Sequence, residues 1–279
     1  MFGYFDGWYF KCESNTQTFA VIPAYHETQR EGSCSIQIIT KDGAWNIPYS
    51  KEAYKKGKDF IQIDDNYFGR KGLRLHIKTE DVCAIGRIEF GEISPLRYDI
   101  MGPFVLVPFM ECRHSIYSMR YAICGNMCIN HKQYDFSNGL GYWEGDRGKS
   151  FPKRYAWTQC MLPHGSVVLS VADIPLAGTQ FIGMIGVVLW KGQEHRFATY
   201  LGGRVIFNQD GWLSVRQGRM TLDAKQIEKS HHPLNAPVTG EMVRTIHESL
   251  RAKAYYRFTI DETIVFAYKV ENASFEYEY

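Results

Sequence analysis

Short stretches of alternating apolar and polar residues, separated by turn dipeptides, recur along this sequence and limit what it can fold into. Ser35–Thr40 leads into Asp42–Gly43, a dipeptide typical of β-hairpin turns. Val205–Phe207 and Trp212–Val215 flank Asp210–Gly211 in the same way. Residues of a strand point alternately to the two faces of a sheet, so a period of two predicts strands. We therefore expect a mainly β chain built from antiparallel hairpins.

One stretch, Thr245–Phe258, leaves helix and strand in competition. Six of its seven even-numbered residues are apolar, and its odd-numbered residues are mostly polar. A helical face can also be drawn through Val243, Ile246, Leu250 and Ala254. Because the alternation includes more residues, we predict a strand. Glu248 then points inward with the apolar set, which is costly unless the carboxylate is paired or functional.

The length of 279 residues suits one large or two medium-sized domains. Gly125–Asn126 and Ser137–Gly139 bracket a polar stretch, which predicts a boundary there. We expect an N-terminal domain of residues 1–127 and a C-terminal domain of residues 128–279. Many short strands separated by turns are typical of sandwiches and barrels. The polar segment Lys51–Lys58 is predicted to be a short helix or a loop.

Charge and cysteine content exclude several classes of protein. The formal net charge is only +2, from 32 basic and 30 acidic residues, which argues against a dedicated nucleic-acid binder. The N-terminus lacks the basic and apolar regions of a signal peptide. The longest apolar run, Phe181–Trp190, is too short to span a membrane as a helix, although peripheral contact stays open. The seven scattered cysteines are interpreted as free thiols, so we expect a cytoplasmic protein.

Two segments stand out as motifs. The first, Tyr4–Lys11, has the sequence Tyr-Phe-Asp-Gly-Trp-Tyr-Phe-Lys. The second combines Gly141-Tyr-Trp-Glu144 with Ser150-Phe-Pro and Trp157-Thr-Gln159. These blocks resemble the signature blocks of the tocopherol cyclase-like family. Weaker similarity to that family is found in Met101–Phe104, Pro108–His114 and Ala273–Tyr277.

The resemblance implies two lipocalin-like β-barrels in tandem, a fold shared with bacterial carotenoid hydratases. Plant members of the family close the chroman ring of vitamin E from a prenylated hydroquinone. This chain is shorter than the plant proteins and carries a charged run at Glu144–Lys149, and we expect it to have no transit peptide. These differences from the plant proteins concern the expected substrate rather than the expected fold. The predicted fold class is thus mainly β, with two tandem lipocalin-like antiparallel β-barrel or sandwich domains.

The chemistry implied by the resemblance starts with protonation of an alkene. That step needs a strong acid in a water-poor pocket, and aromatic faces stabilise the cation that forms. A carboxylic acid kept protonated by apolar surroundings fits this role. We predict Glu144 as the proton donor and Tyr142, Trp157 and Gln159 as pocket-lining residues. A second acid candidate, Asp6, and further ligand-binding candidates are Trp8, Tyr9, Glu111, His114 and Glu248.

Structural explanations compete with these assignments. The charged run Glu144–Lys149 fits a solvated hairpin tip, in which each ion pair contributes at most about 1 kcal/mol. The aromatic candidates also fit a simple barrel core. The charged run Glu144–Lys149 lacks the glycine spacing of a P-loop, and the sequence contains no Gly-x-Ser-x-Gly nucleophile elbow. We expect no metal and no cofactor.

The leading hypothesis is a cofactor-free, acid-initiated cyclisation or hydration of a prenylated hydrophobic small molecule in a barrel cavity. The substrate would be a prenylquinol, a polyene or another terpenoid, and the enzyme class an isomerase or intramolecular lyase. The alternative is a non-catalytic lipocalin-like carrier of a hydrophobic ligand, because the same lining would serve it without any acid. A third hypothesis is a scaffold that acts through protein contacts. Whether the protein is an enzyme stays open at this stage.

Overall fold

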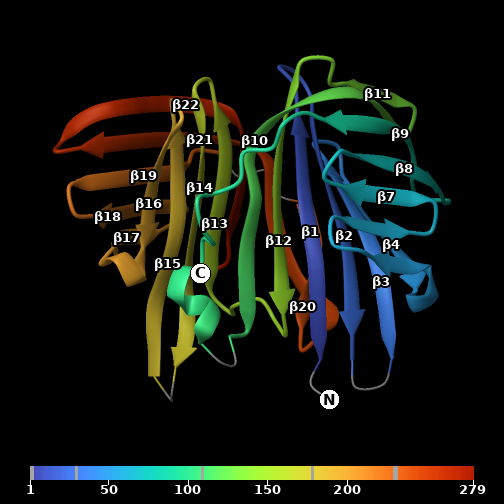
Figure 1. The fold of residues 1–279 in the computed structure, drawn as a ribbon, viewed down its shortest axis with the longest axis horizontal. Coiled ribbons are helices and arrows are strands. Elements are labelled where there is room, and N and C mark those ends of the chain that lie inside the picture. The colour runs from blue at the N-terminus through green and yellow to red at the C-terminus, as the bar shows by residue number, and fades with distance from the viewer. Residues whose placement is uncertain (1–2, 29–30, 108–109, 177–178, 229–231) are drawn as a thin grey trace. The chain divides into compact units, whose positions relative to one another are not determined.

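The computed structural model describes residues 3–28, 31–107, 110–176, 179–228 and 232–279. Within these residues the regular structure is strand, apart from the short 3₁₀ helices η1 (Lys51–Ala53), η2 (Gly102–Leu106) and η3 (Thr199–Leu201). The strands form two sheets, and every pairing reported below is antiparallel (Figure 1). The prediction of a mainly β antiparallel fold is confirmed. None of the described segments is a helix long and apolar enough to cross a membrane.

The first sheet contains strands β1 to β12, in the order β4-β3-β2-β1-β12-β10-β9-β8-β7-β6-β5, with β11 paired to β10. Their bounds are β1 Tyr4–Glu13, β2 Thr18–Glu27, β3 Gly32–Thr40, β4 Ala44–Ser50, β5 Tyr54–Lys56, β6 Phe60–Ile63, β7 Asn66–Gly69, β8 Gly72–Lys78, β9 Cys83–Phe90, β10 Cys112–Ile129, β11 Lys132–Asp135 and β12 Gly139–Gly148.

The second sheet contains strands β13 to β22, in the order β16-β15-β14-β13-β22-β21-β19-β18-β17, with β20 paired to β21. Their bounds are β13 Tyr155–Leu162, β14 Gly165–Leu176, β15 Thr179–Trp190, β16 Gln193–Ala198, β17 Arg204–Gln209, β18 Trp212–Gln217, β19 Met220–Gln226, β20 His232–Val238, β21 Glu241–Ile260 and β22 Thr263–Tyr277. Strand β21 confirms the strand predicted for Thr245–Phe258.

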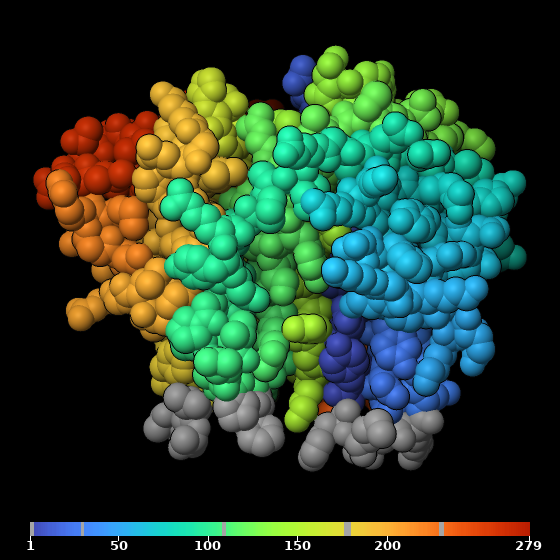
Figure 2. Space-filling model, viewed as in Figure 1, coloured from blue at the N-terminus to red at the C-terminus, as the bar shows by residue number. Residues whose placement is uncertain are grey.

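The chain divides into two compact units, and each unit is built from three segments that are separated in the sequence. Unit 1 comprises Met1–Arg97, Glu111–Phe151 and Leu234–Thr245, and unit 2 comprises Tyr98–Met110, Pro152–Pro233 and Ile246–Tyr279. Residues 127 and 128, between which we expected a boundary, both lie in strand β10 of unit 1. Part of the unit 2 segment that follows residue 97 lies on the surface in the view of Figure 2.

The two units repeat one connectivity. In each, four strands form a meander (β1 to β4, and β13 to β16), and a 3₁₀ helix follows. In each, the last strand pairs with the first (β12 with β1, and β22 with β13). A long strand, β10 or β21, pairs with the other side of that last strand. Three central strands therefore occur in the same order twice.

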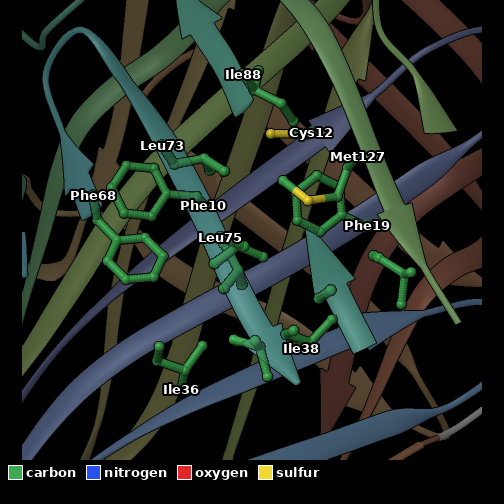
Figure 3. Packing of buried hydrophobic residues seen from close by; sticks show 14 of the residues in the cluster. Phe10, Cys12, Phe19, Ile36, Ile38, Phe68, Leu73, Leu75, Ile88 and Met127 are labelled. Atoms are coloured by element: carbon green, nitrogen blue, oxygen red, sulfur yellow. The ribbon is translucent and has the colours of Figure 1, made fainter. Parts of the chain in front are cut away.

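Unit 1 has an apolar core on one side of its sheet. Trp8, Phe10 and Cys12 of β1 belong to this core, together with residues from β2, β3 and β6 to β10. Figure 3 shows Phe10 beside Phe68, and the two rings stack with centroids 6.1 Å apart. Since strand residues alternate, the remaining residues of β1 point to the opposite side of the sheet.

That opposite side of unit 1 is buried but polar, and we call it the polar face of unit 1. Its members on the central strands are Tyr9, Lys11, His114, Tyr142, Glu144 and Asp146. Gln37 of β3 also lies on this face, and its amide exchanges hydrogen bonds of 3.1 and 2.9 Å with the backbone of Asn235. The returning segment Leu234–Thr245 therefore contacts the polar face within unit 1.

Unit 2 has the same two-sided organisation. Ala156 and Cys160 of β13 face its apolar core, along with Ala254 and Tyr256 of β21. The alternate residues form the polar face of unit 2, whose members are Tyr155, Trp157, Gln159, Glu248 and Glu276. Tyr155, Trp157 and Gln159 stand at alternate positions of β13 and therefore share this face. The seven cysteines of the chain are free thiols, also as predicted.

Candidate active site

Strand β12 carries three polar residues at alternate positions on the polar face of unit 1. Tyr142, Glu144 and Asp146 therefore stand in one row, whereas Trp143 between them packs in the core. Glu144 is only 4% exposed although it carries an ionisable carboxyl group. Burying such a group is costly unless it is paired or hydrogen-bonded, so its neighbours decide what it can do.

His114 of β10 joins the two carboxyl groups of this row. It lies directly opposite Asp146 in the β10–β12 register. Its Nδ1 is 3.0 Å from Asp146 Oδ1, and its Nε2 is 3.3 Å from Glu144 Oε2. The imidazole ring thus bridges Asp146 and Glu144, with one nitrogen directed to each.

The contacts of His114 fix where protons must lie. Nδ1 keeps its proton, because it faces the carboxylate of Asp146. Nε2 and Glu144 Oε2 are then two potential acceptors at 3.3 Å, and they attract each other only if one proton lies between them. A proton on either the imidazole or the carboxyl group would make this contact favourable, and it is the proton that such a pair could transfer.

Tyr142 supplies a second donor to the same carboxyl oxygen. Its hydroxyl donates a hydrogen bond to Glu144 Oε2, and the side chain is fully buried. Burial, and then the charge of Glu144, hold the pKa of Tyr142 well above its ordinary value, so the phenol stays protonated. Tyr9 of β1 lies opposite Glu144, and its ring is 6.5 Å from that of Tyr142. Glu144 thus has two tyrosines among its neighbours.

Cys112 completes the cluster at the start of β10. Its Sγ is 3.5 Å from Asp146 Oδ1, the oxygen that also faces His114. Burial, and then the charge of Asp146, hold the pKa of the Cys112 thiol well above its ordinary value. The thiol therefore acts as a weak donor to Asp146 rather than as a nucleophile.

The same side chains are the described residues that best fit a metal ion. One ligand atom each from His114, Glu144 and Asp146 lies within 4.8 Å of the others. Imidazole and carboxylate ligands suit several divalent cations. Our expectation that the protein uses no metal stays a prediction.

Unit 2 presents a related row with a different composition. In the register of β13, β22 and β21, Trp157 lies opposite Glu276, and Glu276 lies opposite Glu248. The hydroxyl of Tyr155 donates a 2.5 Å hydrogen bond to Glu276 Oε2. Glu248 is fully buried, so two residues with carboxyl groups lie in register on neighbouring strands.

The face on which Glu248 lies differs from the sequence prediction. We expected it to point inward together with the even-numbered residues up to Phe258. The β21–β22 pairing shifts register between Ser249 and Ala252, which marks a β-bulge. The bulge changes the phase of the alternation, so Ala252 faces the core while Glu248 faces the opposite side. Glu248 is buried as predicted, but outside the core.

Asp6 and Trp8 lie away from the cluster around Glu144. Both are on the side of β1 opposite to Tyr9. Asp6 is held by Lys56 at 2.5 Å and by the Tyr4 hydroxyl at 3.2 Å. Trp8 packs in the core, with its ring centroid 5.0 Å from that of Trp143. The structure therefore brings neither residue to the predicted acid.

The remaining sequence candidates divide between the units. Glu111 precedes β10, and its carbonyl oxygen accepts a 2.7 Å hydrogen bond from the Lys149 amide. Gln159 is fully buried on the polar face of unit 2 and lies opposite Ser274. Glu144 and Tyr142 belong to unit 1, whereas Trp157, Gln159 and Glu248 belong to unit 2. The solvated hairpin-tip explanation is wrong for Glu144, which lies inside β12 and is 4% exposed.

Four residues of these clusters were not among the sequence candidates: Cys112, Asp146, Tyr155 and Glu276. Asp146 could have been predicted from the sequence, because it continues the alternation of Tyr142 and Glu144 and so shares their face. Tyr155 carried a similar signal, because it alternates with Trp157 and Gln159 along the sequence. Glu276 depends on the pairing of β22 with two other strands, and no local pattern reports such a pairing.

Comparisons with known proteins support the fold. No family model matches the chain, and no curated protein matches it. Among solved structures, kievitone hydratase from Nectria haematococca is similar with a TM-score of 0.61 and 10% identity, covering 97% of this chain and 88% of that one. CghA is similar with a TM-score of 0.60 and 9% identity, covering 99% and 88%. The predicted fold of two lipocalin-like β domains agrees with these neighbours, whereas identities this low carry no functional conclusion.

Proposed function

We propose that this protein is a hydratase or cyclase that protonates a carbon–carbon double bond of a prenylated hydrophobic small molecule. The observation that carries the proposal is the buried carboxyl group of Glu144, with His114 Nε2 at 3.3 Å and the Tyr142 hydroxyl on the same oxygen. The solved neighbour titled kievitone hydratase is compatible with this chemistry. The tocopherol cyclase-like signature blocks favour the same class of reaction.

The reaction starts at Glu144. Its carboxyl proton is transferred to one alkene carbon, and the adjacent carbon becomes a carbocation. In hydration, a water molecule then bonds to the cation and releases a proton to the imidazole of His114. In cyclisation, a phenol oxygen of the substrate bonds instead and releases the same proton. Transfer from His114 Nε2 to Glu144 restores the acid, so atoms and protons balance.

The other residues of the cluster support this cycle. Asp146 holds Nδ1 of His114 and stabilises the imidazolium that forms when the ring takes a proton. Tyr142 stabilises the carboxylate that forms when Glu144 releases its proton. The aromatic faces of Tyr9 and Tyr142 favour the carbocation.

The experiment uses a farnesylated hydroquinone as the probe and deuterium oxide as the solvent. Turnover by wild-type protein incorporates one solvent deuteron at a former alkene carbon, which mass spectrometry detects together with the added water or the new ring. Glu144→Gln should lower the turnover rate by a factor of about 10²–10⁴. The matched control is Glu89→Gln, because Glu89 is an exposed glutamate that pairs with Arg87 on β9.

Two outcomes would contradict the proposal. Wild-type rates in Glu144→Gln would remove Glu144 as the proton donor. Stoichiometric binding of the probe, recovered unchanged after long incubation with wild-type protein, would favour the non-catalytic carrier instead.

A further inference from the structure

His26 is a buried histidine outside the cluster described above. It lies on β2 and is 4% exposed. Its Nε2 is 3.0 Å from the hydroxyl oxygen of Ser35 on β3. Among the described residues, no atom makes a hydrogen bond with its Nδ1. Burial lowers the pKa of His26 to about 4, so the ring is neutral at physiological pH.

A buried ring nitrogen without a protein partner is expensive. Leaving such a group unpaired costs about 1–3 kcal/mol, and most buried polar atoms in folded proteins have a partner. Phe5 of β1 and Ser33 of β3 lie opposite His26 in the sheet, and Phe151 packs edge-on to Phe5 at 5.4 Å. Because no described residue pairs with Nδ1, that nitrogen can be satisfied by a molecule other than the protein.

His26 lies on the same polar face as the acid cluster. Val21 of β2 faces the core, so His26, five residues further on, faces the opposite side, as does its partner Ser35. Ala24, two residues before His26 on β2, lies opposite Gly7 of β1. Gly7 in turn lies opposite Asp146 of β12. Strand β1 alone thus separates the strand of His26 from the strand of Asp146 and Glu144.

The residues on the diagonal between Asp146 and His26 are small: Gly7 on β1 has no side chain, and Ala24 on β2 has only a methyl group. An added Cβ atom at Gly7 would lie 3.1 Å from the Cβ of Ala24, and Phe5 borders this path opposite His26. Two strand spacings correspond to about 10 Å. A molecule that reacts at Glu144 and extends across Gly7 would reach His26.

We propose that His26, oriented by Ser35, binds a hydroxyl group of the substrate. A hydroxyl group both donates and accepts a hydrogen bond, so it can satisfy Nδ1 in either tautomer that the Ser35 contact allows. This inference rests on the proposed function for the identity of the ligand. It specifies a substrate with a hydroxyl group about 10 Å or more from the double bond that is protonated.

The test measures binding of two probes that differ only in that group: a farnesylated hydroquinone and its dimethyl ether. Wild-type protein should bind the hydroquinone at least tenfold more tightly by titration calorimetry. His26→Phe keeps a buried planar ring but offers no nitrogen, and it should bind both probes equally. His26→Gln retains a donor and an acceptor and should recover part of the preference. Ser35→Ala serves as an independent variant if His26→Phe does not fold.

The nitrogen resonances of His26 provide a second measurement. In ¹⁵N-labelled wild-type protein, the hydroquinone should shift the Nδ1 resonance, whereas the dimethyl ether should leave it unchanged. An equal preference in wild-type protein and in both His26 variants would overturn the assignment, and so would failure of either probe to bind. Glu144→Gln should lose turnover but keep the tenfold preference, so the two proposals fail separately.

Discussion

The central rows of the two units share one connectivity but hold different side chains. In unit 1 the residues opposite one another on β1, β12 and β10 are Gly7, Asp146 and His114. In unit 2 the equivalent strands β13, β22 and β21 place Trp157, Glu276 and Glu248 in register. An acid faces a base in the first row, whereas an acid faces an acid in the second.

The difference teaches which position decides the chemistry. The long strand, β10 or β21, supplies the residue opposite the acid of the last strand in both units. A histidine there can receive a proton near neutral pH and return it. A glutamate there can only share a proton with its neighbour, because two adjacent carboxylates repel each other. One fold thus places an acid–histidine pair, Asp146 and His114, and a pair of glutamates, Glu276 and Glu248, at equivalent positions of its central strands.

The largest expected effect separates the two rows by activity. His114→Gln should lower turnover of the farnesylated hydroquinone by a factor of about 10²–10⁴, because it removes the base that restores Glu144. Glu248→Gln should lower it by less than about tenfold, the scale of one lost neutral hydrogen bond. Steady-state rates measured by mass spectrometry check both values. Equal losses in the two variants would mean that the row of unit 2 takes part in the proton transfer.

The response of stability to acid should differ in sign between the polar faces. The pKa of His26 falls from 6.5 to about 4 on folding, so below pH 6.5 the unfolded chain takes up a proton that the folded chain refuses. This residue alone should therefore reduce the free energy of unfolding by roughly 3 kcal/mol between pH 7 and pH 4. His26→Gln should abolish that part of the loss in urea titrations at the two pH values. An unchanged pH dependence would show that the ring is protonated in the folded state.

The carboxyl pair of unit 2 should respond in the opposite direction. Glu248 and Glu276 repel each other when both are ionised, and Glu276→Gln removes one charge while keeping an acceptor for the Tyr155 hydroxyl. We expect Glu276→Gln to raise the free energy of unfolding by about 1 kcal/mol at pH 8. Protonation of either carboxyl group removes the repulsion, so the gain should become smaller as the pH is lowered towards 4. Urea titrations at both pH values decide this, and a destabilised variant at pH 8 would show that Glu276 is needed as an anion.

The smallest expected effect compares two buried tyrosines in the long strands. Tyr121 of β10 donates a 3.3 Å hydrogen bond to the carbonyl of Tyr142, and Tyr256 of β21 is 2.5 Å from the hydroxyl oxygen of Thr158. Phenylalanine at either position should reduce the free energy of unfolding by about 0.5–1.5 kcal/mol, with the larger loss at Tyr256. Chemical unfolding of the two variants measures this. A larger loss at Tyr121 would contradict the ranking by hydrogen-bond length.

Much of the fold was predictable because alternation is a local property. Asp42–Gly43 and Asp210–Gly211 both connect paired strands, as their turn chemistry indicates. The candidate proton donor Glu144 was predictable for the same reason, because Tyr142 and Glu144 are two residues apart and therefore lie on the same face of the strand. Lys51–Lys58, predicted to be a short helix or a loop, contains η1 followed by β5, and the strand was missed.

What could not be predicted depends on pairing between distant strands. The bridge from His114 to Asp146 needs the β10–β12 register, which joins residues 32 apart in the chain. The Glu248–Glu276 pair needs a register that a bulge shifts. A bulge displaces every later residue to the other face, and alternation alone does not reveal it. For this reason the composition of each polar row became visible only in the structure.

The interleaving of the two units has a consequence for synthesis on the ribosome. The last segment of unit 1, Leu234–Thr245, follows most of unit 2 in the chain, so unit 1 stays incomplete for 94 residues after Phe151. At about 5–20 residues per second, this interval lasts roughly 5–20 s. During that time the part of the polar face that meets Asn235 through Gln37 lacks its partner. A nascent chain released before residue 234 would therefore expose buried polar groups of both units, which makes it a substrate for chaperones or proteases.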